Sequence, residues 1–138
     1  MAVHVERTST LEVCTSEDVV KVRQEVRHRS AAVGFSLVDQ TKFVTAASEI
    51  ARNTIDHGSG GIARIETITA PGKRGLRLIF EDQGPGIADI KLAMQDGYST
   101  GGGLGMGMPG AKRLSNEFHV ESAPGKGTTV TLVRWKST

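Results

Sequence analysis

The sequence predicts an α+β fold, a two-layer α/β sandwich in which a mixed, mostly antiparallel sheet carries helices on one face. Three observations predict it: the element order β-α-α-β-β-α-α-β-β, the apolar alternation of half-buried strands, and two consecutive amphipathic helices. The chain has 138 residues, the usual size of one compact unit, so residues 1–138 are expected to form a single domain.

The first strand and the first helix are expected between residues 10 and 34. Residues 10–14 alternate apolar with polar side chains, which predicts a half-buried strand. Thr15 or Ser16 is the expected helix N-cap, and Gly34 suits the C-cap. Small and apolar residues recur at helical spacing and form the expected core face: Val19, Val22, Val26, Ser30 and Val33.

The second helix is expected to begin after Ser36 and to run to about His57. Asp39 follows Ser36 by three residues, which is the spacing of a capping box. A glycine-rich run over 58–61 ends the helix. Four of its residues share a narrow sector that forms the expected core face: Phe43, Ala47, Ile50 and Thr54.

The remaining chain is expected to hold four strands and two shorter helices. The first two of these strands are separated by a Pro-Gly turn, which predicts an antiparallel hairpin. The expected ranges are 62–69 and 75–81 for the hairpin strands, 87–94 for a short helix, 97–114 for a glycine-rich segment and the helix that it enters, and 118–122 and 128–135 for the last strands.

Composition excludes several classes of protein. The 17 Lys and Arg residues against 15 Asp and Glu leave a formal charge of +2, too small to indicate nucleic-acid binding. No apolar stretch is long enough to span a bilayer, and the N-terminus lacks the apolar run of a signal peptide. Cys14 is the single cysteine, which excludes an internal disulfide and fits a cytoplasmic protein.

Glycine is unevenly distributed along the chain. It makes up 17 of the 138 residues, about 12% against a typical ~7%. Eleven of these glycines lie between Gly84 and Gly127. Because glycine permits backbone conformations and close approaches that other residues do not, the site of function is expected in this half.

Glu49 and Asn53 lie four residues apart at the edge of the second helix's core face, which places their tips side by side. For this pair alone, the simpler interpretation is an ordinary polar pair on a solvated flank. The functional interpretation is a carboxylate general base beside an amide oxygen that can bind a hard cation such as Mg²⁺.

Asp82 directly follows a strand whose apolar side chains alternate inward, so its carboxylate is expected to face the interior or a pocket. A carboxylate only accepts hydrogen bonds, which suits an exocyclic amine such as that of adenine. Gly84 and Gly86 remove side chains where a flat base approaches the backbone. Taken alone, the segment is more simply interpreted as an ordinary Pro-Gly turn after a strand.

A dense glycine run precedes the helix near the C-terminus: Gly101, Gly102, Gly103, Leu104, Gly105 and Gly107. Clustered glycines before a helix expose consecutive backbone N–H groups, which is how proteins hold phosphates. The run does not continue into a Walker A loop, because Ala111 stands where that motif requires Lys. It also matches G-x-G-x-x-G, but no βαβ unit surrounds it, and we attribute this match to chance.

Four short motifs occur in order: E-x-x-x-N at Glu49, D-x-G-x-G at Asp82, G-x-G-x-G over 103–107 and G-x-G-T at Gly125. Together they resemble the N, G1, G2 and G3 boxes of the GHKL superfamily of ATPases, which includes Hsp90-like chaperones, type II topoisomerase subunits and histidine kinases. The resemblance covers nearly the whole chain. It implies the Bergerat ATP-binding fold with a glycine-rich ATP lid.

The resemblance also implies a role for each motif residue. Asp82 would bind the adenine amino group, assisted by Thr128, and Asn53 would coordinate Mg²⁺. Glu49 would act as the catalytic general base in phosphoryl transfer from ATP. The remaining residues implied in nucleotide binding are Gly84, Gly86, Gly101, Gly102, Gly103, Leu104, Gly105 and Gly107.

Three longer stretches, 81–87, 96–105 and 109–114, resemble the RsbT-type switch kinases of the stressosome. A single domain of this length is not expected to include the phosphoacceptor module of a histidine kinase or a topoisomerase transducer. The resemblance implies a cytoplasmic serine/threonine protein kinase that phosphorylates small STAS-domain scaffold or antagonist proteins. Such a kinase then switches partner and activates a PP2C-type phosphatase in a bacterial sigma-factor stress-signalling pathway, with no nucleic-acid or membrane partner.

Two alternatives stay open. The sequence Asp56-His57-Gly58 is similar to the anti-sigma factor kinases, which sequester a sigma factor and phosphorylate an anti-anti-sigma factor. The second alternative is a degenerate member of the superfamily that binds no nucleotide. The intact Glu49, Asn53 and Asp82 argue against it.

Overall fold

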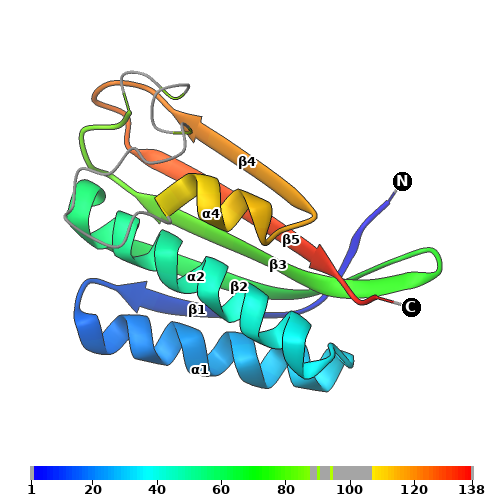
Figure 1. The fold of residues 1–138 in the computed structure, drawn as a ribbon. Helices are drawn as coiled ribbons and strands as arrows, with labels where there is room; N and C mark the ends of the chain where they lie inside the picture. The colour runs from blue at the N-terminus through cyan, green and yellow to red at the C-terminus, as the bar shows by residue number, and fades with distance from the viewer. Residues whose placement is uncertain (1, 88–89, 91–93, 95–106, 138) are drawn as a thin grey trace.

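The structure is a computed structural model that describes residues 2–87, 90, 94 and 107–137 (Figure 1). Most of the helix expected over 87–94, and residues 97–106 of the glycine-rich segment, lie outside the described residues. The elements are β1 (His4–Val13), α1 (Ser16–Val33), α2 (Leu37–Gly58), β2 (Gly61–Ala70), β3 (Lys73–Asp82), α4 (Gly107–Arg113), β4 (Glu117–Ser122) and β5 (Thr128–Trp135).

The five described strands form a sheet in the order β1-β2-β3-β5-β4, in which each neighbouring pair is antiparallel. Figure 1 shows α1, α2 and α4 on the same face of this sheet. The predicted hairpin is β2–β3, whose register pairs Ala70 with Lys73 at the turn and Gly61 with Asp82 at the open end. The predicted α+β two-layer fold is therefore confirmed.

β1 is longer than the strand expected over 10–14, since it begins at His4 and ends at Val13. Its register with β2 runs from His4 opposite Thr69 to Val13 opposite Gly61. Most side chains of this edge strand are exposed, so its first residues carry no clear apolar alternation. Pairing with β2 extends β1 to His4, and the local sequence pattern does not indicate this pairing.

Both long helices begin at the predicted caps. The Thr15 side chain accepts a hydrogen bond from the Asp18 amide, and the Ser36 side chain accepts one from the Asp39 amide. The capping box expected at Ser36 is found instead at Thr15, where the Asp18 carboxylate bonds back to the N-cap backbone. The Asp39 carboxylate turns to Arg134, a partner on another element.

The predicted inward faces of both helices are buried. They pack on the inward side chains of the central strands to form the core. Its most deeply buried large residues are Phe43, Phe80, Ile50, Ile65, Leu76, Leu78, Leu132, Val13, Val22 and Val26.

Arg29 of α1 is buried within this layer, with 2% of its surface exposed. Its Nε donates to Glu25 Oε2 at 3.0 Å and its Nη1 donates to Thr67 Oγ1 at 3.0 Å. Nη1 also donates to the Arg7 carbonyl at 3.3 Å, and Nη2 donates to Ser9 Oγ. One guanidinium therefore joins α1 to both β1 and β2.

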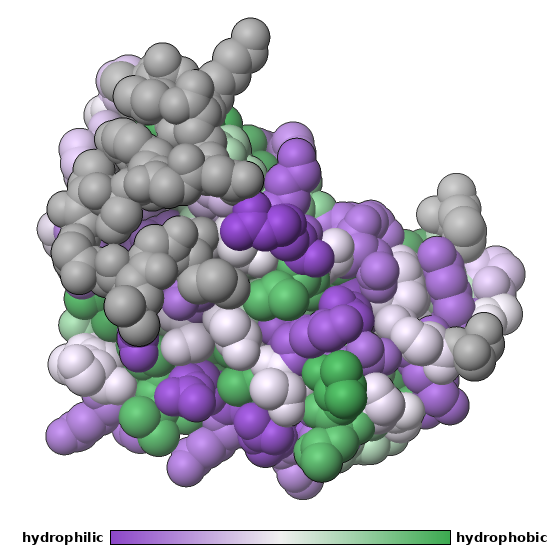
Figure 2. Space-filling view, viewed as in Figure 1, coloured by the Kyte–Doolittle hydropathy of each residue, from purple (hydrophilic) through white to green (hydrophobic). Residues whose placement is uncertain are grey.

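The outer surface of the helical layer mixes hydrophilic and hydrophobic residues, as Figure 2 shows for the described part of that face. Val20, Leu37 and Val38 are its exposed large hydrophobic residues on α1 and α2. Among the described helices, none is both long and apolar enough to cross a bilayer.

Candidate functional site

Asp82 is the last residue of β3 and lies half-buried on the helix-covered side of the sheet. It continues the inward series of Leu78 and Phe80, whose side chains are in the core. Its Oδ1 accepts a hydrogen bond from the Gly84 N–H at 2.9 Å. The expectation that this carboxylate faces the interior is therefore correct.

The end of α2 lies so close to Asp82 that a side chain at position 58 would overlap it. Gly58 is buried, and a Cβ on it would overlap the Asp82 carboxyl group. A Cβ on Gly84 would lie 2.6 Å from the Gly58 Cα. From the sequence, Gly58 was expected to end the helix and was noted in the stretch Asp56-His57-Gly58, but its contact with Asp82 was not predicted.

Thr128 lies directly opposite Asp82 in the register of β3 and β5, so the two side chains share a face. Thr128 is 9% exposed, and its hydroxyl lies 2.8 Å from Ser122 Oγ. Ser122 also donates to the Gly127 carbonyl at 3.0 Å and accepts from the Ile87 N–H at 2.7 Å. Ser122, which sequence analysis missed, therefore holds Thr128 and the turn after β3 in place.

Gly86 lies in the turn after Asp82 with a φ of +78°, a left-handed conformation that favours glycine. A Cβ there would also overlap the carbonyl of Ala123, in the β4–β5 connection. The Gly125 N–H donates to the Pro85 carbonyl at 2.7 Å and joins the same two segments. The expected G1 and G3 boxes are thus in direct contact.

Glu49 and Asn53 lie half-buried on the flank of α2, four residues apart. Glu49 Oε2 accepts a hydrogen bond from the Gly107 N–H at 3.2 Å, which brings the start of α4 to this flank. Within the described part of the chain, neither Glu49 Oε1 nor the side-chain amide of Asn53 forms a hydrogen bond.

A hollow of about 510 Å³ lies where α2 ends and β3 leaves the sheet. Its lining residues are Gly58, Ser59, Gly60, Gly61, Ile62, Glu81, Asp82, Gln83 and Gly84. Glu49 and Asn53 do not line it. Five predicted phosphate-binding residues lie outside the described part of the chain: Gly101, Gly102, Gly103, Leu104 and Gly105.

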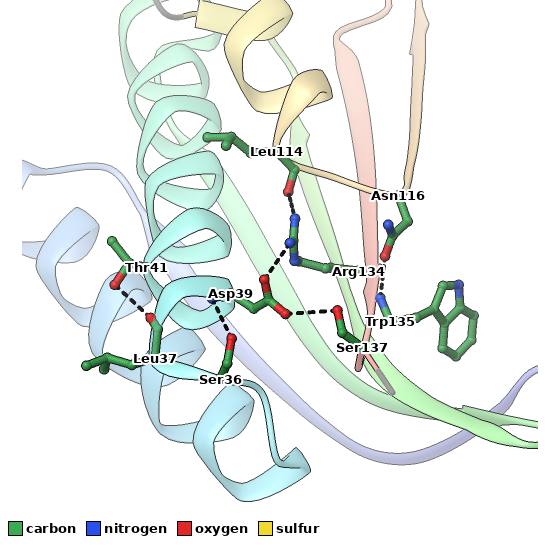
Figure 3. Close-up of polar contacts among 9 residues, drawn as sticks. All are labelled: Ser36, Leu37, Asp39, Thr41, Leu114, Asn116, Arg134, Trp135 and Ser137. Carbon is green, nitrogen blue, oxygen red and sulfur yellow. Dashed lines mark hydrogen bonds and ion pairs between the residues drawn. The ribbon is translucent and has the colours of Figure 1, made fainter.

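A polar cluster joins the residue after α4 to the first turn of α2 and to β5 (Figure 3). Arg134 Nη1 donates to the Leu114 carbonyl at 2.7 Å, and its Nη2 donates to Asp39 Oδ1 at 2.8 Å. Burial raises the pKa of Asp39, but hydrogen bonds from Arg134 and Ser137 outweigh it, and the pKa lies below its ordinary value. This cluster was not predicted from the sequence, because Asp39 and Arg134 lie 95 residues apart.

The chain is similar to known proteins along most of its length. Residues 38–138 match the histidine kinase-, DNA gyrase B-, and HSP90-like ATPase family. The chain is 46% identical to the serine/threonine-protein kinase RsbT of Bacillus subtilis over 127 residues, which cover 92% of this chain and 96% of the relative.

Two further matches have lower sequence identity and support narrower conclusions. The anti-sigma F factor of a Thermoanaerobacter species is 37% identical over 97 residues, or 66% of each chain. The crystal structure of the RsbU and RsbW domains of a Mycobacterium tuberculosis protein matches all of this chain with a TM-score of 0.62. This chain spans 34% of that structure at 20% identity, so the match supports the fold alone. The chain therefore belongs to the histidine kinase-, DNA gyrase B- and HSP90-like ATPase family, and within it to the serine/threonine-protein kinases related to RsbT.

Proposed function

We propose that this serine/threonine protein kinase transfers the γ-phosphoryl group of ATP to a STAS-domain protein in a sigma-factor stress-signalling pathway. The observation that carries the proposal is 46% identity to a serine/threonine-protein kinase across 92% of the chain. Residues 1–138 are proposed to form a single domain. The protein is proposed to act in the cytoplasm.

The adenine ring is proposed to bind at Asp82. Of its two carboxylate oxygens, Oδ1 already accepts from the Gly84 amide, which leaves Oδ2 to accept from the adenine amino group. Thr128 shares its face and is held by Ser122. Gly84 and Gly86 keep the approach free of side chains, and the glycines of 101–107 with Leu104 are proposed to hold the phosphates.

Mg²⁺ is proposed to bind through the Asn53 amide oxygen, the phosphates and water. The residues fit this mode, because Asn53 is half-buried and its amide forms no hydrogen bond within the described part of the chain. The described residues contain no group of three or more His, Cys, Asp or Glu that could hold a metal ion. Mg²⁺ commonly binds through few protein ligands together with substrate phosphates, whose charge it then neutralises.

Glu49 is the proposed general base. Its Oε2 is fixed by the Gly107 N–H, and its Oε1 remains to accept a proton. As the acceptor hydroxyl oxygen bonds to the γ-phosphorus, the bond from that phosphorus to the bridging β,γ-oxygen breaks. ADP leaves, and the hydroxyl proton passes to Glu49.

A PP2C-type phosphatase is the proposed second partner, bound after release of the STAS protein. The observation that favours the alternative, an anti-sigma factor kinase, is 37% identity to an anti-sigma F factor. The relative with the higher identity and the longer match is the RsbT kinase, so we favour the switch kinase.

The test is transfer of radiolabelled phosphate from ATP to purified STAS-domain proteins in the presence of Mg²⁺. We expect Glu49→Gln to keep ATP affinity in calorimetry and to lose phosphate transfer. Transfer by Glu49→Gln at the wild-type rate would show that the base is assigned wrongly. The absence of ATP binding by the wild type would support a degenerate member.

A pull-down with nucleotide present separates the two partner classes. The switch-kinase proposal expects capture of a STAS-domain protein and of a PP2C-type phosphatase. Stable capture of a sigma factor would instead establish the anti-sigma alternative.

A further inference from the structure

α4 is fastened to the rest of the protein at both of its ends. At its start, the Gly107 N–H donates to Glu49 Oε2 at 3.2 Å. At its end, the carbonyl of Leu114, the residue after α4, accepts from Arg134 Nη1 at 2.7 Å (Figure 3). Both attachments lead to α2, because Glu49 lies within it and Arg134 also holds Asp39 in its first turn.

The attachment at the end of α4 uses two arms of one guanidinium. Leu114 O is among the carbonyls that a helix end leaves without an intrahelical partner. Arg134 donates to it and to Asp39 Oδ1 at once, and Ser137 Oγ donates to Asp39 Oδ2 at 3.0 Å. The Arg134 and Asp39 side chains are each 13% exposed, so solvent weakens the pair little.

α4 depends on such attachments because it is short. It has seven residues, whereas isolated helices below about 12–15 residues are marginal in water. Its residues from Met108 to Ala111 are buried. Its position along α2 is therefore set by packing together with the two polar attachments.

Arg29 offers a matched comparison inside the same molecule. Each of its three guanidinium nitrogens donates a hydrogen bond, and these bonds join α1 to β1 and β2. Arg134 Nε, by contrast, is buried without a partner among the described residues. Arg29 is buried and Arg134 is largely buried, and both are paired with a carboxylate, but only Arg134 contacts the end of α4.

We infer that Arg134 is a positioning residue for phosphoryl transfer. By holding Leu114 and Asp39 together, it sets α4 along α2 and keeps the Gly107 amide on the Glu49 carboxylate. That hydrogen bond fixes one carboxylate oxygen and thereby orients the other toward the acceptor hydroxyl. The inference rests on the proposed role of Glu49 as general base.

Hydrogen exchange of the free protein tests the structural step. The variants are Arg134→Gln and Arg134→Lys, with Arg29→Gln as the matched control. In Arg134→Gln we expect amide exchange over 108–114 to rise about tenfold, as for loss of one hydrogen bond to a charged group, and exchange in α1 to stay unchanged. In Arg29→Gln we expect exchange in α1 to rise and exchange over 108–114 to stay unchanged.

Kinetics with the STAS-domain protein and ATP test the catalytic step, at a temperature where each variant is folded. We expect kcat to fall about tenfold in Arg134→Gln, because small displacements of catalytic groups are costly, and KM for the STAS protein to stay unchanged. Arg134→Lys should give an intermediate kcat, since one ammonium lacks the planar fork that bonds both acceptors. Arg29→Gln should keep the wild-type kcat.

Each outcome decides the inference. Wild-type exchange over 108–114 in Arg134→Gln, or an equal loss of kcat in Arg29→Gln, would overturn it. If Arg134→Gln does not fold, Arg134→Lys supplies both measurements, and unchanged exchange and kcat there would count against it. If Glu49→Gln transfers phosphate normally, the catalytic role inferred for Arg134 is overturned with the assigned base, and hydrogen exchange still decides whether Arg134 holds α4.

Discussion

The first turns of α1 and α2 share a local pattern, a hydroxyl cap followed three residues later by aspartate, and use that aspartate differently. The Thr15 hydroxyl accepts from the Asp18 amide at 3.2 Å, and the Ser36 hydroxyl accepts from the Asp39 amide at 3.1 Å. The Asp18 carboxylate then accepts from the backbone amides just before its own helix. The Asp39 carboxylate instead accepts from Arg134, 95 residues along the chain.

This difference shows that an aspartate in the first turn can serve its own helix or a distant element, and that the distant partner decides which. Asp18 closes a contact of three to four residues at the exposed start of α1. Asp39 joins the helix that carries Glu49 to β5 and, through Arg134, to the end of α4. One aspartate therefore makes only local contacts, whereas the other links α2 to the C-terminal strand.

The largest expected difference between the two aspartates is in the free energy of unfolding. Asp39→Ala leaves the largely buried Arg134 without its carboxylate, and we expect it to cost about 3 kcal/mol, as for breaking a buried ion pair. Asp18→Ala removes an exposed carboxylate and should cost far less. Urea unfolding of both variants measures the difference. Equal losses would show that Asp39 acts only as a helix-start acid.

A third aspartate, Asp82, belongs to neither group. Asp82→Asn should lower ATP affinity by about 1.5–3 kcal/mol, because a charge-assisted hydrogen bond to adenine is lost. An Asn side chain can still accept from the Gly84 amide, so we expect the free energy of unfolding to stay close to that of the wild type. Calorimetry with ATP and urea unfolding measure the two quantities. Unchanged ATP affinity would remove Asp82 from the proposed site.

The acid dependence of stability should separate Asp39 from its neutral variant. The pKa of Asp39 is lowered in the folded protein, so its contribution is present above the unfolded pKa of about 3.9 and is lost as the pH falls through the folded pKa. The difference in unfolding free energy between wild type and Asp39→Asn should therefore shrink on acidification below about pH 4. Urea unfolding at several pH values checks this sign. A difference that does not vary with pH would contradict it.

The fold was largely predictable because its signals are local. Apolar spacing places the core faces of α1 and α2, and the Pro-Gly turn predicts the β2–β3 hairpin. The pattern of Ser36 and Asp39 led to a wrong prediction, since a capping box and a long-range ion pair share that spacing. The early start of β1 at His4 depends on pairing with β2 and was missed for the same reason.

The candidate site was predictable only in part. Motif order indicated Asp82, and its register with Thr128 on β5 agrees with a shared role. Gly58 and Ser122 escaped prediction because their importance comes from what they touch, the Asp82 carboxyl and the Thr128 hydroxyl. Roles for Glu49 and the glycine-rich segment stay predictions, since only ligand binding tests them.

The smallest expected effect concerns the caps themselves. Thr15→Ala and Ser36→Ala each remove one side-chain acceptor at a helix start, and each should cost about 1 kcal/mol, the usual value for a cap. The two costs should agree within about 0.5 kcal/mol, because each hydroxyl accepts one backbone hydrogen bond at the start of its helix. Urea unfolding beside the two aspartate variants gives the comparison. A much larger loss in Ser36→Ala would mean that the cap orients Asp39 toward Arg134, and would place the difference between the two helices in the whole first turn rather than in the aspartate alone.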